Sequence, residues 1–277
     1  MIWKRNLSGF CKMGRTIVTT SHKPDNESVE IARQAAEILQ AELVERDRLP
    51  FTRLREKYNA ENVLVAARGQ ITIHTPSGEC FFHPSMSVPR VKAIRQGRTD
   101  HMVEAMALKT GDYMLDCTLG LGADSVVAAF VVGESGKVVG VEAAAELAYL
   151  VKCGLAGYRE GPKFLREVMP RIEVVHDNCE QYLLAQPENS FDIVYFDPMF
   201  RYSRRKSSSM EPLRGLVKPD PLNSRLIKEA FRVAKRRVVM KENSFSKEFA
   251  ELGFTRVIGG RYSPVAFGVI DKQEAAR

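Results

Sequence analysis

Hydrophobic and polar residues follow two different patterns along the chain, and the change between them predicts two parts. Up to residue 82, short apolar runs are separated by turn residues, which indicates a small α+β unit. We expect the first helix of this unit to bury Val29, Ala32, Ala36, Leu39 and Leu43. The expected strands cover 16–20, 62–66, 70–74 and 80–82, and the expected helices follow a turn at 22–27 and cover 51–58.

From residue 89 onward, apolar strands alternate with amphipathic helices, after a basic helical stretch that we expect to reach residue 109. This alternation over about 160 residues indicates an α/β fold with an open, mostly parallel, doubly wound sheet. Only 259–264 separate the last two strands, so we expect them to form an antiparallel hairpin. The expected strands are 113–117, 137–141, 172–176, 191–197, 236–241, 254–258 and 265–270, and the expected helices are 123–132, 143–155, 178–185, 223–234 and 246–252.

The predicted organisation is an N-terminal extension at 1–14, a small α+β domain at 15–88 and a larger domain at 89–277. Met13 can itself serve as an initiation site, which would place residues 1–12 outside the fold. The N-terminus has basic residues but no long apolar core after them, so we expect no secretory signal. No apolar run approaches the roughly 18 residues of a membrane span, and we expect no membrane partner.

Composition places the chain among globular proteins, with 44% hydrophobic and 27% charged residues in 277. Its five cysteines are odd in number and widely spaced, which argues against a disulfide framework and against a zinc site. We therefore expect no metal and a reducing, cytoplasmic location.

Positive charge is concentrated in residues 201–240, which hold twelve Lys and Arg and three acids, a net charge of +9 within a chain of net charge +7. Such a block is typical of proteins that bind a polyanion, most often a nucleic acid. The alternative is a solvated surface that binds nothing. In the expected helix at 223–234, Leu226, Ile227, Ala230 and Phe231 form the apolar face, while Arg225, Lys228, Arg232 and Lys235 form the opposite stripe.

The first strand of the larger domain runs into Asp116-Cys-Thr-Leu-Gly-Leu-Gly-Ala-Asp124. Gly120 and Gly122 allow a tight turn in which the backbone approaches a ligand closely. A dinucleotide-binding turn has a third glycine that is missing here, and Asp124 would repel a pyrophosphate. Asp116 also suits a cationic ligand better than an anionic one. The alternative is an ordinary glycine turn in which Asp124 caps the following helix.

Polar side chains also follow the next two strands. Glu142 ends the second strand, where an acid can accept hydrogen bonds from both hydroxyls of an adenosine ribose. Asp177 and Asn178 follow the third strand and are placed to contact an adenine edge. Alternatively, Glu142 is a surface acid at the start of a helix, and Asn178 forms a capping box with Gln181. Their order at successive strand ends favours a cofactor that contains a nucleoside.

The fourth strand ends in Asp197-Pro-Met-Phe200. A carboxylate there can accept hydrogen bonds from an exocyclic amine and hold its nitrogen in line with a sulfonium methyl group. Pro198 stiffens the turn, and Phe200 offers a ring on which a flipped base can stack. The alternative is a simple strand-to-loop turn with a core phenylalanine.

These motifs resemble those of the small-subunit ribosomal RNA guanine-N2 methyltransferase J family. The resemblance covers roughly residues 100–270 and continues in Lys206-Ser207, Leu216-Val-Lys-Pro-Asp220 and Lys235-Arg-Arg-Val-Val-Met-Lys241. Arg201 replaces the family's usual proline and Ala123 its usual arginine, as in a divergent branch. The C-terminal hairpin is likewise typical of methyltransferases that use S-adenosylmethionine and unusual in dehydrogenases.

The resemblance implies a Rossmann-like fold, S-adenosylmethionine as cofactor and methyl transfer to a guanine N2 in ribosomal RNA. Two alternatives stay open: methylation of another nucleic acid or a small molecule, and a catalytically silent RNA-binding role. The target nucleotide and the oligomeric state also stay open. Asp197, Pro198 and Phe200 are the expected catalytic residues. The expected RNA contacts are Arg201, Arg204, Arg205, Lys206, Arg225, Lys228 and Arg232. The expected cofactor contacts are Asp116, Thr118, Gly120, Gly122, Ala123, Asp124, Glu142, Ala143, Asp177, Asn178 and Asp197.

Overall fold

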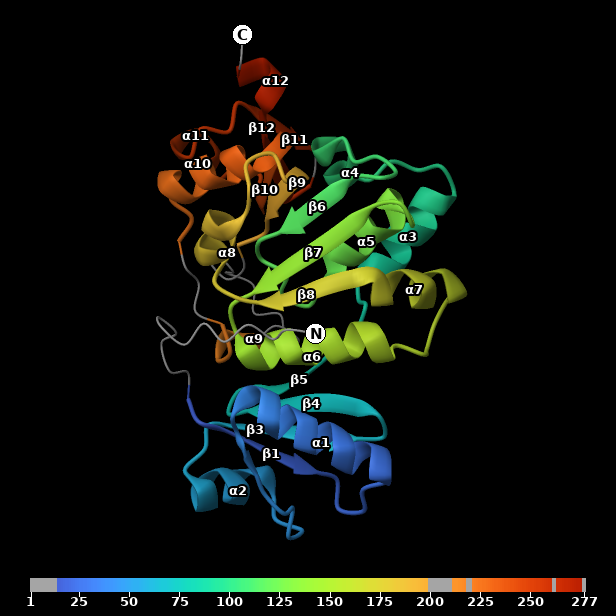
Figure 1. The fold of residues 1–277 in the computed structure, drawn as a ribbon, viewed down its shortest axis with the longest axis vertical. Coiled ribbons are helices and arrows are strands. Elements are labelled where there is room, and N and C mark those ends of the chain that lie inside the picture. The colour runs from blue at the N-terminus through green and yellow to red at the C-terminus, as the bar shows by residue number, and fades with distance from the viewer. Residues whose placement is uncertain (1–13, 199–210, 218–220, 261–262, 276–277) are drawn as a thin grey trace. The chain divides into compact units, whose positions relative to one another are not determined.

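The structure, a computed structural model, describes residues 14–198, 211–217, 221–260 and 263–275 (Figure 1). Contacts divide the chain into two compact units. The first holds the described residues of Met1–His83, Ala144–Tyr158 and Tyr202–Lys218, and the second holds those of Pro84–Ala143, Arg159–Arg201 and Pro219–Arg277. The domain boundary expected near residue 88 stays a prediction.

The first unit is a five-stranded mixed sheet with helices packed on it. Its strand order is β2-β1-β3-β4-β5, in which β1 pairs in parallel with β2 and β3, and the other pairs are antiparallel. Helices α1 and α2 pack on β3, and α6 packs on β4. The elements are β1 (Thr16–Thr20), α1 (Asn26–Leu39), β2 (Glu42–Leu43), α2 (Phe51–Tyr58), β3 (Asn62–Ala67), β4 (Gln70–Thr75), β5 (Gly78–Phe81), α6 (Ala145–Gly157) and α9 (Glu211–Arg214).

The buried face of α1 differs from the one expected. Val29 is 47% exposed, whereas Ser28 and Ala32 are fully buried. The hydroxyl of Ser28 accepts a hydrogen bond from the backbone N–H of Arg68, and this bond draws the polar residue inward. The helix ends before Leu43, which lies on β2 and is 48% exposed.

The second unit carries the doubly wound sheet expected from the sequence. Its seven strands follow the order β11-β12-β10-β9-β6-β7-β8. Strands β10, β9, β6, β7 and β8 are parallel, while β12 pairs antiparallel with both β10 and β11, which confirms the C-terminal hairpin. The strands are β6 (Tyr113–Asp116), β7 (Lys137–Glu142), β8 (Ile172–His176), β9 (Phe191–Phe196), β10 (Ala234–Asn243), β11 (Arg256–Gly259) and β12 (Val265–Asp271).

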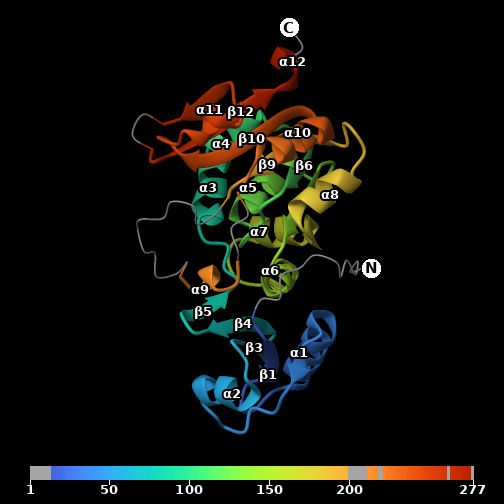
Figure 2. The same ribbon diagram turned by 90° about the vertical axis from the view of Figure 1, so that its left-hand side faces the viewer.

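The chain direction across this sheet reverses at β6. The crossover through α5 leads from β6 to β7, and the crossover through α10 leads the other way, from β9 to β10. Crossovers between parallel strands are right-handed in nearly all proteins, and this hand places the two helices on opposite faces of the sheet (Figure 2). Ligands bind at such a switch point, here between β6 and β9. The helices are α3 (Ser87–Arg95), α4 (His101–Met106), α5 (Ala123–Val132), α7 (Lys163–Val168), α8 (Cys179–Ala185), α10 (Ser224–Val233), α11 (Glu248–Glu251) and α12 (Lys272–Ala275).

Local turns explain where the helices depart from expectation. The basic stretch at 89–109 is two helices, because Gly97 adopts a left-handed conformation with φ of 77° between α3 and α4. Helix α10 buries Leu226, Ile227 and Ala230 as expected, whereas Phe231 is only partly buried. Within the described part of the chain, no helix combines the length and apolar character needed to cross a bilayer.

Candidate active site

Five parallel strands bring their carboxyl ends to one edge of the larger sheet. Strands β8, β7, β6, β9 and β10 are consecutive neighbours in the sheet. Residues that are far apart in the sequence therefore lie side by side at this edge. In the order of the strands, they are Asp177, Glu142, Asp116, Asp197 and Lys241.

The glycine loop after β6 is fixed to the end of β7. Gly120 and Gly122 have φ of 52° and 77°, a backbone conformation that favours glycine. The N–H of Gly120 donates to Oε2 of Glu142 at 3.1 Å. Gly140 on β7 leaves room for Leu119, because a Cβ at position 140 would collide with that side chain. The loop is thus held in one conformation, with the first turn of α5 directly after it.

Asp116 is a buried side chain that holds the glycine loop against the first turn of α5. Its Oδ1 accepts from the N–H of Thr118 at 3.0 Å, and its Oδ2 accepts from the Ser125 hydroxyl at 2.6 Å. Burial raises the pKa of Asp116 to about 7, although both hydrogen bonds act in the opposite direction. The Thr118 hydroxyl in turn accepts from the N–H of Asp197 at 2.6 Å, which ties the glycine loop to the end of β9.

Asp124 does not cap α5. The helix begins after Gly122, and the Asp124 carboxylate turns into the protein, where it accepts from Arg90 of α3, from the Tyr195 hydroxyl at 2.8 Å and from Lys241 Nζ at 2.9 Å. Burial opposes ionisation, but the charges of Lys241 and Arg90 prevail and lower the pKa of Asp124. Asp124 is therefore an ionised anchor of this network.

Lys241 is shared between two carboxylates. Its Nζ lies 2.7 Å from Oδ2 of Asp197, and Met240 pairs with Phe196 in the register of β10 and β9. Burial raises the pKa of Asp197, an effect that Lys241 opposes and the nearby Asp124 charge reinforces. Burial acts to lower the pKa of Lys241, but the two carboxylates raise it. The ammonium group of Lys241 therefore lies between Asp124, which is ionised, and Asp197, which takes up a proton more readily.

The residues expected to hold a nucleoside lie at the ends of β7 and β8. Glu142 is only 6% exposed, so it is not a surface acid, whereas Ala143 after it is exposed. Oδ1 of Asp177 accepts from the N–H of Asn178 at 2.8 Å. Asn178 caps α8, because its side chain accepts from the N–H of Glu180 at 2.9 Å.

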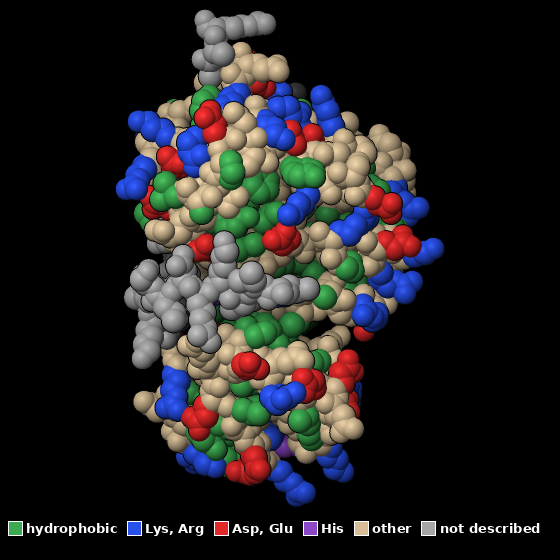
Figure 3. All heavy atoms as spheres, viewed as in Figure 1, with side chains coloured by type: hydrophobic (Ala, Val, Ile, Leu, Met, Phe, Trp, Pro, Cys, Tyr) green, Lys and Arg blue, Asp and Glu red, His purple; other side chains and the backbone are tan. Residues whose placement is uncertain are grey.

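The basic residues are less uniform than the sequence suggests. Arg225 and Lys228 are exposed, and Arg225 pairs with Glu180 at 3.2 Å. Arg232 instead donates to Glu229 and to the carbonyl groups of Leu183 and Gln186. On the face drawn in Figure 3, Lys and Arg side chains of the second unit stand among Asp and Glu side chains. Phe200, Arg201, Arg204, Arg205 and Lys206 lie outside the described residues.

Sequence reasoning missed three members of the network, namely Arg90, Tyr195 and Lys241. Tyr195 carries a hydroxyl inside an otherwise apolar strand, which is a signal for a buried hydrogen bond. Lys241 lies near the end of β10, and β10 is the neighbour of β9 in the sheet. Once the strand order is known, Lys241 can be placed near the end of β9. Arg90 had no comparable signal, because α3 joins the network only through tertiary contacts.

Comparisons with known proteins agree with this geometry. Residues 64–261 match a family described as putative SAM-dependent methyltransferase. YpiP, an uncharacterized protein of Bacillus subtilis (strain 168), is 35% identical over 255 residues, which cover 92% of this chain and 98% of that protein.

Two further proteins are similar to this chain. The ribosomal RNA small subunit methyltransferase J of Aeromonas salmonicida is 31% identical over 156 residues, 54% of this chain and 61% of that protein. A crystal structure of a SAM-dependent methyltransferase from Neisseria gonorrhoeae superposes with a TM-score of 0.62 over 92% of this chain and 95% of that chain. The two sequences are 19% identical, so this similarity shows the fold alone.

Proposed function

Because the chain belongs to the family of putative SAM-dependent methyltransferases, we propose that it methylates the exocyclic N2 amine of a guanine in small-subunit ribosomal RNA. The methyl donor is S-adenosylmethionine. The ribosomal RNA substrate is supported by the relative named as small-subunit methyltransferase J, of which the alignment covers 61%. The guanine and its N2 position rest on the resemblance of Asp197-Pro-Met-Phe200 to that family's motif.

The glycine loop and Glu142 fit the cofactor. Gly120 and Gly122 expose backbone at the switch point without a Cβ, and the buried Glu142 carboxylate lies at the end of the next strand as a ribose acceptor. Asp177 and Asn178, with Ala143 exposed nearby, supply the adenine side of this edge. Bound here, S-adenosylmethionine supplies an activated methyl group. The acidic surroundings formed by Asp116 and Glu142 suit its positive sulfonium.

Asp197 is proposed to orient the amine. Its backbone is fixed by Thr118 and its Oδ2 by Lys241, so the carboxylate has one defined direction. The carboxylate accepts an N–H of the amine and stabilises the positive charge that develops on the nitrogen. Because burial raises the pKa of Asp197, it takes up the proton that the amine releases more readily than an exposed aspartate would. Pro198 stiffens the turn, and Phe200 is proposed to stack on the base.

The RNA is proposed to run along the basic block. Arg225 and Lys228 of α10 are exposed for phosphate contacts, and the expected contacts Arg201, Arg204, Arg205 and Lys206 follow the catalytic turn in the sequence. A ribosomal RNA substrate also places the protein in the cytoplasm in this proposal.

One observation carries the proposal: Asp197 leaves the strand beside the glycine loop and is held there from both sides, by Thr118 and Lys241. The test is methyl transfer from radiolabelled S-adenosylmethionine to small ribosomal subunits and free ribosomal RNA from a strain that lacks the gene. Nucleoside analysis is then expected to give N2-methylguanosine.

If a different methylated nucleoside is found, the protein is a methyltransferase but the N2 of guanine is not its target. Labelling of DNA or small molecules only would favour the other substrate classes. If cofactor and RNA both bind but no methyl group is transferred to any substrate, the protein is a silent RNA-binding relative and the proposed activity is wrong.

A further inference from the structure

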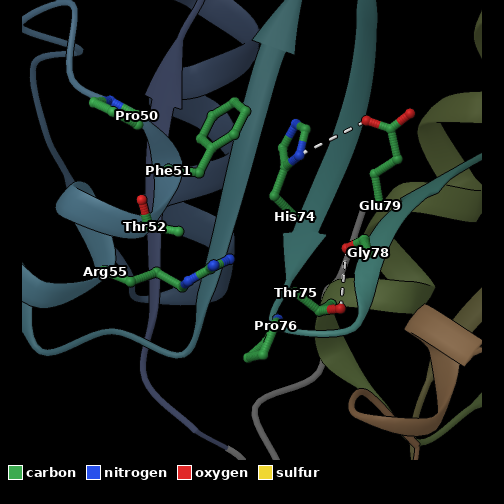
Figure 4. A pocket seen from close by; sticks show the side chains of 9 residues that line it. All are labelled: Pro50, Phe51, Thr52, Arg55, His74, Thr75, Pro76, Gly78 and Glu79. Carbon is green, nitrogen blue, oxygen red and sulfur yellow. Dashed lines mark hydrogen bonds and ion pairs between the residues drawn. The ribbon is translucent and has the colours of Figure 1, made fainter.

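The first unit contains a cavity that the proposed methyl-transfer site does not use. It has a volume of about 410 Å³ and lies between the start of α2 and the turn that joins β4 to β5. Figure 4 shows Arg55 on the side of α2 and Glu79 on the side of β5, with the rings of Phe51 and His74 between them. The lining residues are Pro50, Phe51, Thr52, Arg55, His74, Thr75, Pro76, Gly78 and Glu79.

Two of these residues form a stack of flat rings. Phe51 and His74 are parallel to within 21°, with ring centres 3.7 Å apart. The guanidinium carbon of Arg46 lies 3.9 Å from the same Phe51 centre, so Arg46 and His74 occupy opposite faces of the ring. Burial lowers the pKa of His74, Glu79 opposes this, and the charges of Arg46 and Arg55 add to it. His74 is thus a neutral ring at pH 7, of the kind on which bases stack.

Arg55 adds a cation to the wall of the cavity. Among the residues that the structure describes, it has no ion-pair partner, and its side chain is partly buried. Arg53, two residues earlier on the same helix, is exposed and pairs with Glu56 at 2.8 Å. The charge of Arg55 is therefore the one that α2 leaves available for an anionic group in the cavity.

The opposite wall is preformed. The Thr75 hydroxyl donates to the carbonyl of Gly78 at 3.0 Å and accepts from the N–H of Ser77 at 3.2 Å. Gly78 has φ of 137°, and a Cβ there would approach Pro212 of α9 to 3.1 Å. The turn therefore needs glycine and keeps its shape, so a ligand does not have to order it.

We propose that this cavity binds one nucleotide of a single-stranded segment of RNA, with the phosphate on Arg55 and the base packed against His74 and the edge of the Phe51 ring, whose two faces Arg46 and His74 already cover. The inference rests on the proposed function, because it takes the bound segment to be part of the RNA substrate. The carboxylate of Glu79 lies 3.8 Å from Nδ1 of His74 and is largely exposed, so it can also accept N–H groups of a base, which a simple anion does not offer. An acidic peptide would match Arg55 but not the flat rings.

The test compares Arg55→Gln with Arg53→Gln in the full-length protein. Binding of a short, fluorescently labelled single-stranded oligoribonucleotide is followed by anisotropy over a range of salt. R55Q is expected to weaken binding about tenfold, as for one charge-assisted hydrogen bond. It is also expected to flatten the salt dependence by about 0.7, the value for one phosphate of a single strand. R53Q removes the same charge on the same helix and is expected to bind like the wild type. Phe51→Leu is expected to weaken binding without changing the salt slope.

The possible outcomes separate this inference from the proposed function. Equal affinity and slope for R55Q and R53Q, with both folded by circular dichroism, would overturn the nucleotide site even if ribosomal RNA is methylated normally. If RNA binding depends on Arg55 but the protein methylates no RNA, the nucleotide site stands and the proposed activity is wrong. Guanosine monophosphate serves as the free-nucleotide arm: if it binds the cavity as tightly as the oligoribonucleotide, the ligand is a free nucleotide and the RNA assignment is wrong. Arg55-dependent binding of an acidic peptide in place of RNA would overturn it as well.

Discussion

Lys241 Nζ lies 2.7 Å from Oδ2 of Asp197, so the expected catalytic carboxylate is paired with a cation from the neighbouring strand. The same ammonium contacts Asp124 at 2.9 Å. Asp124 is ionised and is also held by Arg90, which leaves Asp197 as the carboxylate whose pKa burial raises. In the proposed methyl transfer, Lys241 is therefore a positioning residue that acts through Asp197.

Lys241→Met is expected to lower the free energy of unfolding by about 2–4 kcal/mol at neutral pH, because it leaves the buried carboxylate of Asp124 and the partly buried one of Asp197 without their shared cation. Lys235→Met, on the more exposed part of the same strand, is expected to change it by less than about 1 kcal/mol. Urea denaturation measures both.

The effect of Lys241→Met depends on pH. The pKa of Asp124 is lowered in the folded state, so its contribution is present above its unfolded pKa of about 4 and is lost as the pH falls through the folded value. The difference between wild type and K241M is therefore expected to shrink in acid. A difference that stays constant with pH would show that the methionine acts through packing and not through the charge.

Asp116→Asn is expected to change how stability depends on pH. Burial raises the pKa of Asp116 to about 7 in the folded state, so between pH 4 and pH 7 the unfolded chain binds fewer protons at this group. Asp116 then makes the wild type less stable as the pH rises, by at most about 1.4 kcal/mol per pH unit. The asparagine variant lacks this slope. Urea midpoints of the two proteins across this range measure the difference, and parallel curves would contradict the raised pKa.

Glu142→Ala is expected to weaken binding of S-adenosylmethionine by about 1.5–3 kcal/mol, the value of hydrogen bonds to a charged acceptor. It also frees the N–H of Gly120 and so loosens the loop. Glu173→Ala is a matched control, because this glutamate of β8 is exposed and pairs with Lys137. Isothermal titration calorimetry measures both affinities. Equal affinity in the two variants would remove Glu142 from the cofactor site. Tighter binding of NAD than of S-adenosylmethionine by the wild type would instead contradict the cofactor.

Asp197→Asn is expected to slow methyl transfer by about 10²–10³ while the fold is kept. The amide still offers an oxygen to the amine but lacks the negative charge that stabilises the attacking nitrogen. Single-turnover transfer to ribosomal RNA measures the rate, and circular dichroism checks the fold. A variant with wild-type rate would mean that this carboxylate does not orient the amine.

The basic stripe of α10 is expected to divide into two kinds of residue. Neutralising Arg225 and Lys228 together is expected to flatten the salt dependence of RNA binding by about 1.4, since each phosphate of a single strand contributes about 0.7. Arg232→Gln is expected instead to lower the free energy of unfolding by about 1–2 kcal/mol, because its guanidinium bonds carbonyl groups of the protein. Filter binding and urea denaturation separate the two effects. A salt slope that R232Q changes as much as the double variant would contradict this division.

Much of the architecture was readable from local pattern. The helix Ala123–Val132 and the strand Ile172–His176 match the expected bounds, because apolar periodicity and turn residues act over a few neighbouring positions. The strand-end acids were found for the same reason, since each follows its own apolar strand. The family resemblance then supplied the cofactor, which the comparisons support.

The sequence by itself therefore determined the alternating elements, the hairpin at the end and the order of polar residues after the strands. Only the tertiary structure decided which charges meet: Arg90 reaches Asp124 from α3, and Lys241 reaches Asp197 from β10. It also decided that Arg232 bonds the protein and that α6 packs on β4 of the first unit. The physical reason is range. Backbone periodicity is set by neighbours in the chain, whereas a buried charge is stabilised by whichever partner the strand order brings within hydrogen-bonding distance.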